Sequence, residues 1–402
     1  MAAGKQNTFP QPLPHLVLIV TSSLSAGFFR GQIARLCQAG YRITFICSPG
    51  PQIAELEAEG ADIIPIPIER EISPWRDLQS LWQLWRTLRR LRPDITNVGT
   101  PKAGLLGGIA AMLARVPCRI YTLHGLRMET AHGSKRRLLL WAEWLACKSA
   151  HHVRCVSPSL RNKAIALGLL GAGADDTKHK AYVVGPGTAN GIAIDQFRAT
   201  PERAVLAQNL RKRWDIPAGA LVIGFAGRFT RDKGIPELYA AFKKLLRDFP
   251  QARLLLLGSF EDGDPVSAEL RSEIASHPCV ILPGFVEDIA PDYQAMDLFV
   301  LPSHREGFPV ATLEAQASSL PVVTTDATGT RDSVLDGLTG LLFPVGDLSA
   351  LHAALDTLLR DPELRERMGK TGAQWVAANF SQADIWESLR RDYQRIIQLE
   401  KP

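Results

Sequence analysis

Short apolar runs alternate with helix-patterned segments along this 402-residue chain, and that alternation constrains the fold more than any other feature. In the first half the runs fall at 15–20, 42–47, 62–66, 95–98, 119–123 and 153–156. In the second half they fall at 221–226, 253–257, 280–282, 298–301, 322–324 and 340–343. Strands separated by helices favour a doubly wound parallel sheet. Because 402 residues exceed what one hydrophobic core supports, we expect two such sheets.

Helical spacing of apolar residues predicts the segments between these strands. The main predicted helices are 28–39, 52–59, 74–91, 101–115, 236–246 and 380–399. In an open parallel sheet, ligands bind beyond the carboxyl ends of the strands, where loop amides and helix N-termini converge. The loops that follow strands are therefore the first places to search for a site.

Two glutamates, Glu306 and Glu314, stand eight residues apart where the strand ending at Leu301 gives way to a helix opening near Pro309. A helix N-terminus attracts anions, because its first amides lack partners within the helix. Carboxylates on either side suit a ligand whose phosphates lie between polyhydroxylated groups, since carboxylates accept hydrogen bonds from hydroxyls. A nucleotide sugar has that shape. The alternative is a surface helix with two solvated acids.

This segment resembles the glutamate-seven-residue-glutamate motif of retaining GT-B glycosyltransferases of family 4. Besides the two glutamates, the residues that carry the resemblance are Pro302, Ser303, Gly307, Phe308 and Pro309. The resemblance implies an α/β fold of the GT-B type, with two Rossmann-like domains whose parallel sheets face each other across a cleft. It assigns Glu306 to the donor sugar and Glu314 to the ribose. Gly307, Phe308, Pro309 and Val310 would line the donor site, with backbone amides near Phe308 and Pro309 stabilising the departing charge.

A second loop with cations and glycines follows the strand at 221–226 and precedes the helix at 236–246. Arg228 offers a planar fork to phosphate oxygens and Lys233 a point charge, while Gly227 permits the turn. Either cation alone could be ordinary surface charge. Together, and with the matching family pattern, they are expected to bind the diphosphate of the donor.

The first half contributes two further candidates. Gly27 lies in a small-residue loop after the first strand, where a glycine allows close approach of backbone to ligand or simply forms a turn. No G-x-G-x-x-G fingerprint is present there, which removes the main support for a dinucleotide site. His124 ends a buried strand on the ligand face, and its place matches the family's histidine beside the donor sugar. It is either catalytic or structural.

Charge divides unevenly along the chain. Residues 1–200 contain 24 Lys and Arg against 13 Asp and Glu, whereas the remainder contains 22 against 28. Five of the eight tryptophans lie in two basic segments, one with Arg86, Arg89 and Arg90, the other with residues 135–137. The stripe of Leu78, Leu81, Trp82, Trp85 and Leu88 fits core packing. Tryptophan beside arginine also suits an anionic membrane surface, which the charge imbalance favours.

Other features bear on location and cofactors. Residues 1–14 are polar and the apolar run after them is short, so we expect no export signal. The six cysteines form no C-x-x-C pair, which indicates reduced thiols and neither a disulfide framework nor a zinc site. Asp262 and Asp264 match D-x-D only formally. We expect no metal, no cofactor and no nucleic-acid partner.

These observations predict a domain plan. With the roles that the GT-B resemblance implies, residues 1–197 are expected to form an acceptor and membrane-facing domain, 198–219 a polar, helix-prone linker, 220–378 the nucleotide-sugar domain, and 379–402 a helix that returns to the first domain. The resemblance extends to the subset that builds capsule and O-antigen repeats, with a UDP-sugar donor and a lipid-linked saccharide acceptor. The protein would work in the cytoplasm, on the inner face of the plasma membrane. Two alternatives are a sugar-nucleotide epimerase of GT-B type and a catalytically silent partner in an assembly complex.

Overall fold

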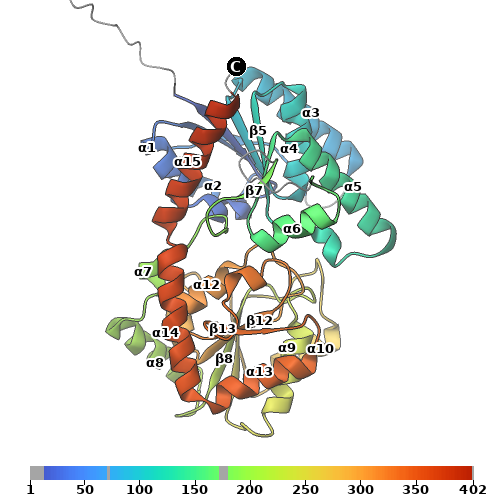
Figure 1. Ribbon diagram of the computed structural model, residues 1–402. Coiled ribbons are helices and arrows are strands. Elements are labelled where there is room, and N and C mark those ends of the chain that lie inside the picture. The colour runs from blue at the N-terminus through green and yellow to red at the C-terminus, as the bar shows by residue number, and fades with distance from the viewer. Residues whose placement is uncertain (1–12, 70–72, 172–179, 401–402) are drawn as a thin grey trace, which may run out of the picture.

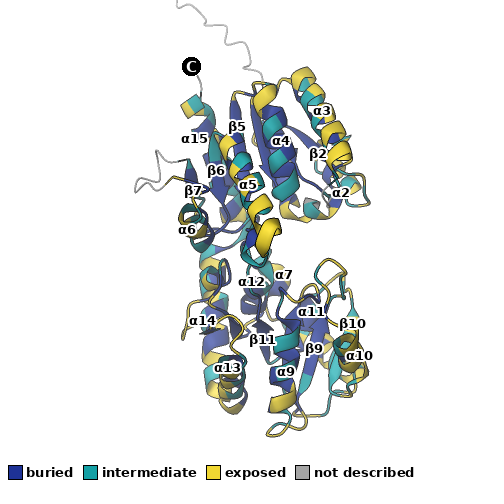
Figure 2. Ribbon diagram, turned by 90° about the vertical axis from the view of Figure 1, so that its right-hand side faces the viewer, coloured by how far each residue is buried: buried dark blue, intermediate teal, exposed yellow. Residues whose placement is uncertain are grey.

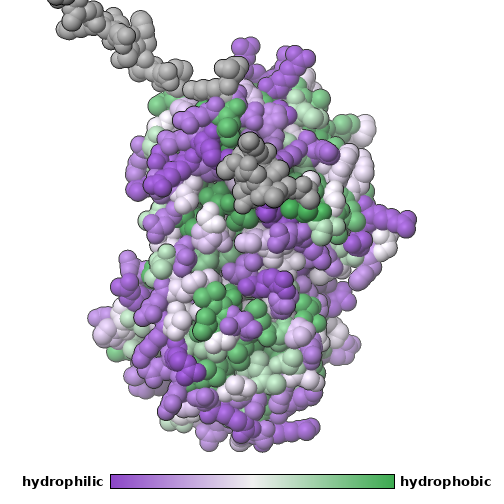
Figure 3. Space-filling view, in the orientation of Figure 1, coloured by the Kyte–Doolittle hydropathy of each residue, from purple (hydrophilic) through white to green (hydrophobic). Residues whose placement is uncertain are grey.

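Two lobes stacked end to end, each a parallel sheet between helices, make up the computed structural model (Figure 1). The structure describes residues 13–69, 73–171 and 180–400. The space-filling view shows hydrophilic side chains over most of the periphery of both lobes (Figure 3). The predicted architecture of two Rossmann-like parallel sheets is confirmed.

The first lobe contains a seven-stranded sheet in the order β3-β2-β1-β4-β5-β6-β7. Its strands are β1 (His15–Ile19), β2 (Arg42–Cys47), β3 (Asp62–Pro65), β4 (Ile95–Gly99), β5 (Cys118–Leu123), β6 (His152–Cys155) and β7 (Ala181–Val183). Its helices are η1 (Ser23–Phe29), α1 (Gln32–Gln38), α2 (Ile53–Ala58), α3 (Pro74–Leu91), α4 (Pro101–Leu113), η2 (Arg127–Glu129), α5 (Gly133–Ser149) and α6 (Pro158–Ala166). The short edge strand β7 was not predicted.

The second lobe contains a six-stranded parallel sheet in the order β10-β9-β8-β11-β12-β13. Its strands are β8 (Val222–Ala226), β9 (Arg253–Leu257), β10 (Val280–Gly284), β11 (Leu298–Leu301), β12 (Val322–Thr325) and β13 (Gly340–Phe343). Its helices are α7 (Ile194–Phe197), α8 (Pro201–Arg213), α9 (Ile235–Leu245), α10 (Ala268–Ser276), α11 (Ala290–Gln294), α12 (Val310–Ala317), η3 (Arg331–Ser333), α13 (Leu348–Arg360) and α14 (Pro362–Asn379), and α15 (Gln382–Glu400) crosses back to the first lobe.

Each face of the first sheet has its own apolar core. Helices α3, α4 and α5 cover one face, with Leu84, Leu88 and Ala103 fully buried between helix and sheet. On the other face, α1 contributes Ile33 and α15 contributes Tyr393 and Ile396. The returning helix therefore completes the core of the lobe it returns to.

The predicted helix at 28–39 is wrong at its start. Residues 23–29 form the 3₁₀ helix η1, and α1 begins only at Gln32. Gly31 between them has φ +77°, and a Cβ there would lie 2.4 Å from the ring of Trp386 on α15. The helix is interrupted at Gly31 because glycine allows both the left-handed turn and this close contact.

Helix α8 lies within the segment predicted as a helix-prone linker. Its Arg211 donates from Nε to the carbonyl of Ala295 at 2.8 Å and from Nη2 to Asp297 Oδ2 at 2.6 Å. Asp297 Oδ2 also accepts from the amide of Val222 at 2.7 Å, at the start of β8. These bonds fix α8 to the second lobe.

Some expectations fall on parts of the chain that the structure does not describe. Of the N-terminal stretch from which we expect no export signal, residues 1–12 lie outside the described residues, as do 401–402 of the last predicted segment. Within the ranges that are described, no helix is long and apolar enough to cross a bilayer. All six cysteines are free thiols.

Candidate functional site

A cleft of about 600 Å³ lies between the carboxyl ends of the two sheets. All the residues predicted to form the donor site line it, and they come from both lobes. They are Gly27, His124, Gly227, Arg228, Lys233, Glu306, Gly307, Phe308, Pro309, Val310 and Glu314. The topology explains this convergence, because the loops that follow β1 and β5 leave the carboxyl end of the first sheet, those that follow β8 and β11 leave the carboxyl end of the second, and both ends border the cleft.

The loop after β8 places its two cations differently. Arg228 is half-exposed and donates from Nη1 to Glu261 Oε2 at 3.2 Å. Lys233 is largely buried and donates from Nζ to Oε1 of Glu306. Gly227 has φ +149°, and the loop closes at Gly234, where a Cβ would lie 2.1 Å from the carbonyl oxygen of Pro302. The close approach of this second glycine brings the cation loop against the glutamate loop.

The loop after β11 holds Glu306 at the lip of the cleft. Its Oε1 accepts from Ser303 Oγ at 2.8 Å, and its backbone amide donates to the carbonyl of Thr328 at 2.9 Å. Gly307 lies directly against the first lobe, where a Cβ would meet the carbonyl oxygen of His124 at 2.0 Å. Only glycine fits there, so the two lobes touch where Glu306 and His124 come together.

Helix α12 begins at Val310, close to the predicted start. Val310 and Glu314 face the cleft from consecutive turns, as their spacing predicts. Proline has no amide N–H, so Pro309 itself cannot be one of the donors expected near this position. The donors at this N-terminus are the amides of Phe308, Val310 and the residues after it.

Glu314 is enclosed by its surroundings. Its Oε2 accepts from Tyr293 Oη at 2.9 Å. Burial raises the pKa of the Glu314 carboxyl to about 6, partly offset by the Tyr293 bond. Glu314 therefore ionises close to neutral pH, and its second oxygen is free to accept from a ligand hydroxyl.

His124 forms the opposite wall of the cleft. Its ring stacks on Phe28, with centroids 5.0 Å apart and planes at 14°. Burial, and next the charge of Arg154, lower its pKa to about 4. At neutral pH His124 is an uncharged imidazole. Gly27 also lines the cleft, and a Cβ there would meet no protein atom within 4 Å, so the space beside it is open.

Several residues at the cleft have no counterpart in the sequence prediction. Asn190, Glu287 and Gln382 line it, the last from α15. Arg305 bridges the lobes by donating from Nε to Thr130 Oγ1 at 3.0 Å and from Nη2 to Asp232 Oδ2 at 3.0 Å. In the sequence, only its position next to Glu306 indicated that Arg305 lies at the site.

The Asp262 and Asp264 pair does not line the cleft. Asp264 accepts from Arg231 Nε at 3.1 Å through Oδ1 and from the amide of Asp232 at 2.8 Å through Oδ2. Its carboxylate therefore holds the cation loop in shape.

Two nucleotide-binding-type sheets, with a cation loop and paired carboxylates meeting between them, define the GT-B class of glycosyltransferase. Comparison with known families agrees: residues 207–375 match the model "Glycosyl transferases group 1", and residues 26–176 match "Glycosyl transferase 4-like domain". The chain belongs to this glycosyltransferase family.

The relatives extend over nearly the whole chain. It is 35% identical over 379 residues to the capsular polysaccharide biosynthesis glycosyltransferase CapM of Staphylococcus aureus, covering 94% of this chain and 96% of the relative. It is 26% identical to the UDP-Gal:alpha-D-GlcNAc-diphosphoundecaprenol alpha-1,3-galactosyltransferase of Escherichia coli, covering 81% of each. Among solved structures, Anabaena HepE in complex with UDP and glucose superposes with a TM-score of 0.77 at 22% identity, covering 94% of this chain and 99% of that one. That likeness shows the shared fold.

Proposed function

We propose that this glycosyltransferase moves a sugar from a UDP-sugar to a saccharide carried on a polyprenyl diphosphate, with retention of configuration, in surface polysaccharide synthesis. The observation that carries the proposal is the convergence of Arg228, Lys233, Glu306 and Glu314 in one cleft between the lobes. Two cations between two carboxylates match a diphosphate between a ribose and a sugar. The E. coli relative's name, which includes a UDP-sugar and a lipid diphosphate, supports both substrates.

The donor is proposed to lie along the cleft from Glu314 to His124. Glu314 accepts from the ribose, and Arg228 with Lys233 neutralises the diphosphate. An ammonium has three N–H donors, so the bond from Lys233 to Glu306 leaves two for phosphate oxygens. Glu306 and His124 then face the sugar itself.

The transfer breaks the bond between the anomeric carbon and the β-phosphate oxygen, and the electron pair stays with the phosphate. An acceptor hydroxyl forms the new bond on the same face of the sugar and gives its proton to the departing phosphate oxygen. Arg228, Lys233 and the first amides of α12 stabilise the charge that develops on the diphosphate, which is preorganised electrostatic catalysis. Retention follows from the family resemblance.

We also propose that the first lobe docks on an anionic membrane. Core packing does not account for the whole predicted stripe of α3: Leu88 is buried and Leu81 and Trp85 are partly buried, but Leu78 and Trp82 are 56% and 52% exposed. That part of the core expectation is wrong. We define the tryptophan face as the exposed apolar residues on α3 and α5. They are Trp75, Leu78, Trp82, Leu138, Trp141 and Trp144.

The position of the tryptophan face suits a lipid-linked acceptor. Helices α3 and α5 lie on either side of α4 on one face of the first sheet, and both carry exposed residues (Figure 2). Both helices begin after the carboxyl end of a strand, so the face lies toward the edge of the sheet that borders the cleft. The exposed Lys135, Arg136 and Arg137 at the start of α5 would contact anionic headgroups. In this arrangement the protein works at the inner face of the plasma membrane.

The domain plan is part of the same proposal. Residues 1–197 would take the acceptor and 220–378 the nucleotide sugar, while the helix after 379 ties them together. Its first residues lie at the cleft through Gln382, and its later ones are in the core of the first lobe.

Thermal protection by a panel of UDP-, GDP- and ADP-sugars tests the donor assignment. We expect a UDP-sugar to raise Tm in the wild-type protein and to lose that effect in Lys233→Ala, while Lys243→Ala behaves as wild type. Lys243 is the matched control because it lies on the exposed side of α9 and pairs with Glu273 of α10. Protection by none of the UDP-sugars would contradict the proposal.

A further inference from the structure

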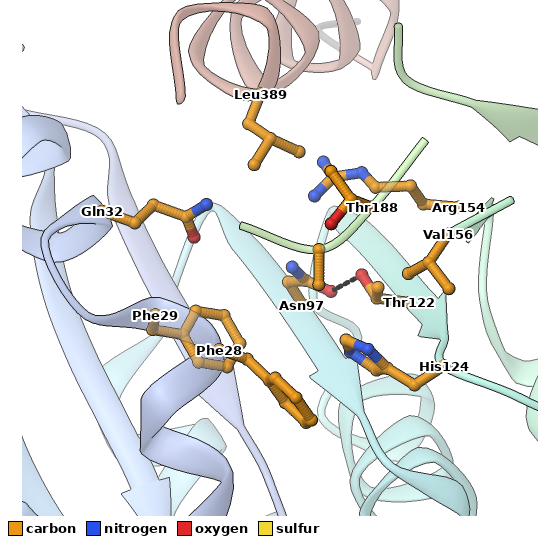
Figure 4. A pocket seen from close by; sticks show the side chains of 11 residues that line it. Phe28, Phe29, Gln32, Asn97, Thr122, His124, Arg154, Val156, Thr188 and Leu389 are labelled. Atoms are coloured by element: carbon orange, nitrogen blue, oxygen red, sulfur yellow. Dashed lines mark hydrogen bonds between the residues drawn. The ribbon is translucent and has the colours of Figure 1, made fainter. Parts of the chain in front are cut away.

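A small cavity adjoins the cleft at His124, which lines both of them. Its volume is about 20 Å³, and it is lined by polar residues of β4, β5 and β6, by Gln32 of α1, by Thr188, and by Leu389 of α15 (Figure 4). That volume accommodates a single water molecule. In the close-up, Phe28, Phe29 and Gln32 lie on one side, and Thr122, His124, Arg154 and Thr188 lie together on the other.

Two buried polar atoms at this cavity have no hydrogen-bond partner within the described part of the chain. They are Nε2 of His124 and Oγ1 of Thr188. Thr188 is held at φ +69°, a conformation that is rare for a β-branched residue. Buried polar atoms are normally satisfied by protein or by ordered water, and a buried water makes about three hydrogen bonds.

Arg154 also lines this cavity. It is buried, and donates from Nε and Nη2 to Asp392 Oδ2 at 3.1 and 2.6 Å and from Nη1 to Tyr393 Oη at 3.4 Å. A guanidinium carries five N–H bonds, so donors remain on the two terminal nitrogens. Asp392 is itself fixed by Tyr182 Oη at 2.8 Å and by Arg395 at 2.8 Å. The guanidinium is therefore held rigidly at the cavity by α15.

We propose that Arg154 is a positioning residue for His124, acting through a water in this cavity. Arg154 can only donate, so the water accepts from it; in the proposed arrangement its two O–H bonds point toward the two unpartnered acceptors, Nε2 of His124 and Oγ1 of Thr188. Nε2 must then carry no proton, and the ring proton lies on Nδ1. His124 thus offers a neutral Nδ1–H donor, and the residue lines the donor cleft. That Nδ1–H faces the donor rests on the proposed function, whereas the tautomer of His124 does not.

Electrostatics around the ring agree with the geometry. Arg154 of β6 is the charged residue that lines the cavity, with Asp392 of α15 bound to it. The charged residues that line the cleft with His124 are Arg30, Arg228, Lys233, Glu287, Glu306 and Glu314. Burial and the Arg154 charge both lower the pKa of His124, so the ring stays neutral. A proton on Nε2 would instead make the ring a second donor to the water, so that one O–H bond of the water would lose its acceptor on the ring.

Nitrogen-15 NMR of the full-length, histidine-labelled protein without donor tests this directly. The sequence has nine histidines, and the signals of His124 are assigned by their loss in His124→Gln. We expect the Nδ1–H tautomer, with Nε2 showing the shift of an unprotonated acceptor, and no protonation of the ring down to about pH 5. The Nε2–H tautomer in the wild-type protein would overturn the proposal, and this measurement needs no variant to fold.

Variants of Arg154 separate positioning from structural support. Arg154→Lys keeps a buried cation with donors and should retain the Nδ1–H tautomer. Arg154→Met combined with Asp392→Asn removes the donor without leaving an unpaired buried charge. It should give a mixture of tautomers and move the pKa of His124 upward from about 4 toward 6.5.

Arg119→Met is the matched control, because Arg119 lies on the same sheet and donates to the carbonyls of Ser149 and Val116. It should leave His124 unchanged. An unchanged tautomer and pKa in the folded Arg154→Met/Asp392→Asn protein would also overturn the proposal. A correct tautomer in a protein that turns over no nucleotide sugar would instead contradict only the proposed function.

Discussion

Lys233 donates a hydrogen bond from Nζ to Oε1 of Glu306, across two loops that follow different strands of the same sheet. Ser303 Oγ donates to the same oxygen at 2.8 Å, so the carboxylate is fixed before any ligand arrives. Lys233, predicted to bind phosphate, and Glu306, predicted to bind the sugar, are thus joined by a hydrogen bond. Removing either one should disturb the other.

Replacing Lys233 or Arg228 with Ala should lower kcat by about 10² to 10³, as for other preorganised donors to developing charge. Steady-state kinetics with saturating acceptor measure this. Arg231→Ala is the control for Arg228, because Arg231 is in the same loop but pairs with Asp264 and does not line the cleft. Normal turnover and donor affinity in both Ala variants would rule out the phosphate role.

Glu314→Ala should raise the donor KM about tenfold or more and change kcat less, because a ribose contact is similar in ground and transition states. In the wild-type protein, KM should also rise as pH falls through about 6, where Glu314 takes up a proton. Tyr293→Phe keeps the carboxylate but removes the bond that lowers its pKa, so this rise should begin at higher pH. A defect confined to kcat would contradict the ribose assignment.

Glu143 makes stability depend on pH. It is 5% exposed and accepts from Tyr121 Oη at 2.5 Å, and burial raises its pKa from 4.5 to about 7. A folded-state pKa above the unfolded value gives stability that is complete below about pH 4.5 and is lost as pH rises through about 7. Glu143→Gln cannot titrate.

The free energy of unfolding of Glu143→Gln, relative to wild type, should therefore increase by roughly 3 kcal/mol between about pH 4 and pH 8. Urea unfolding at several pH values measures it. Glu57→Gln, on an exposed position of α2, is the control. A constant difference for Glu143→Gln across this range would show that the carboxyl does not ionise where its burial implies.

Membrane docking predicts salt-sensitive binding to anionic vesicles and none to zwitterionic ones. Each basic residue near the surface contributes about 1 kcal/mol, and screening shortens from about 10 Å at 0.1 M salt to about 3 Å at 1 M. Cosedimentation should weaken in Arg136→Glu/Arg137→Glu and in Trp141→Ala. Lys212→Glu/Arg213→Glu, with the same charge change on α8 of the second lobe, should bind as wild type. Equal binding to both vesicle types would contradict electrostatic docking.

Local patterns predicted much of this molecule. Strands and helices follow from the periodicity of residues close together in the sequence. The same local patterns locate the loops that carry Arg228, Lys233, Glu306 and Glu314. Because the loops after parallel strands gather at the carboxyl end of their sheet, the topology of each lobe brings its predicted residues together, and the two lobes face each other across the cleft.

Contacts between distant parts of the chain could not be predicted in the same way. The break at Gly31 depends on Trp386, and the buried pair of Arg154 with Asp392 joins residues 238 positions apart. Periodicity predicted a single apolar stripe on α3. The packing of α4 decides which residues of that stripe face solvent, and Trp82 is one of them.

Transfer of labelled sugar from a UDP-sugar to a polyprenyl-diphosphate-linked saccharide tests the central claim most directly. We predict labelled lipid product with the wild-type protein, dependent on acceptor, with the anomeric configuration of the donor, and reduced by about 10² or more in Lys233→Ala. Isomerisation of the donor sugar without acceptor, or no consumption of any nucleotide sugar while the protein remains folded, would contradict it.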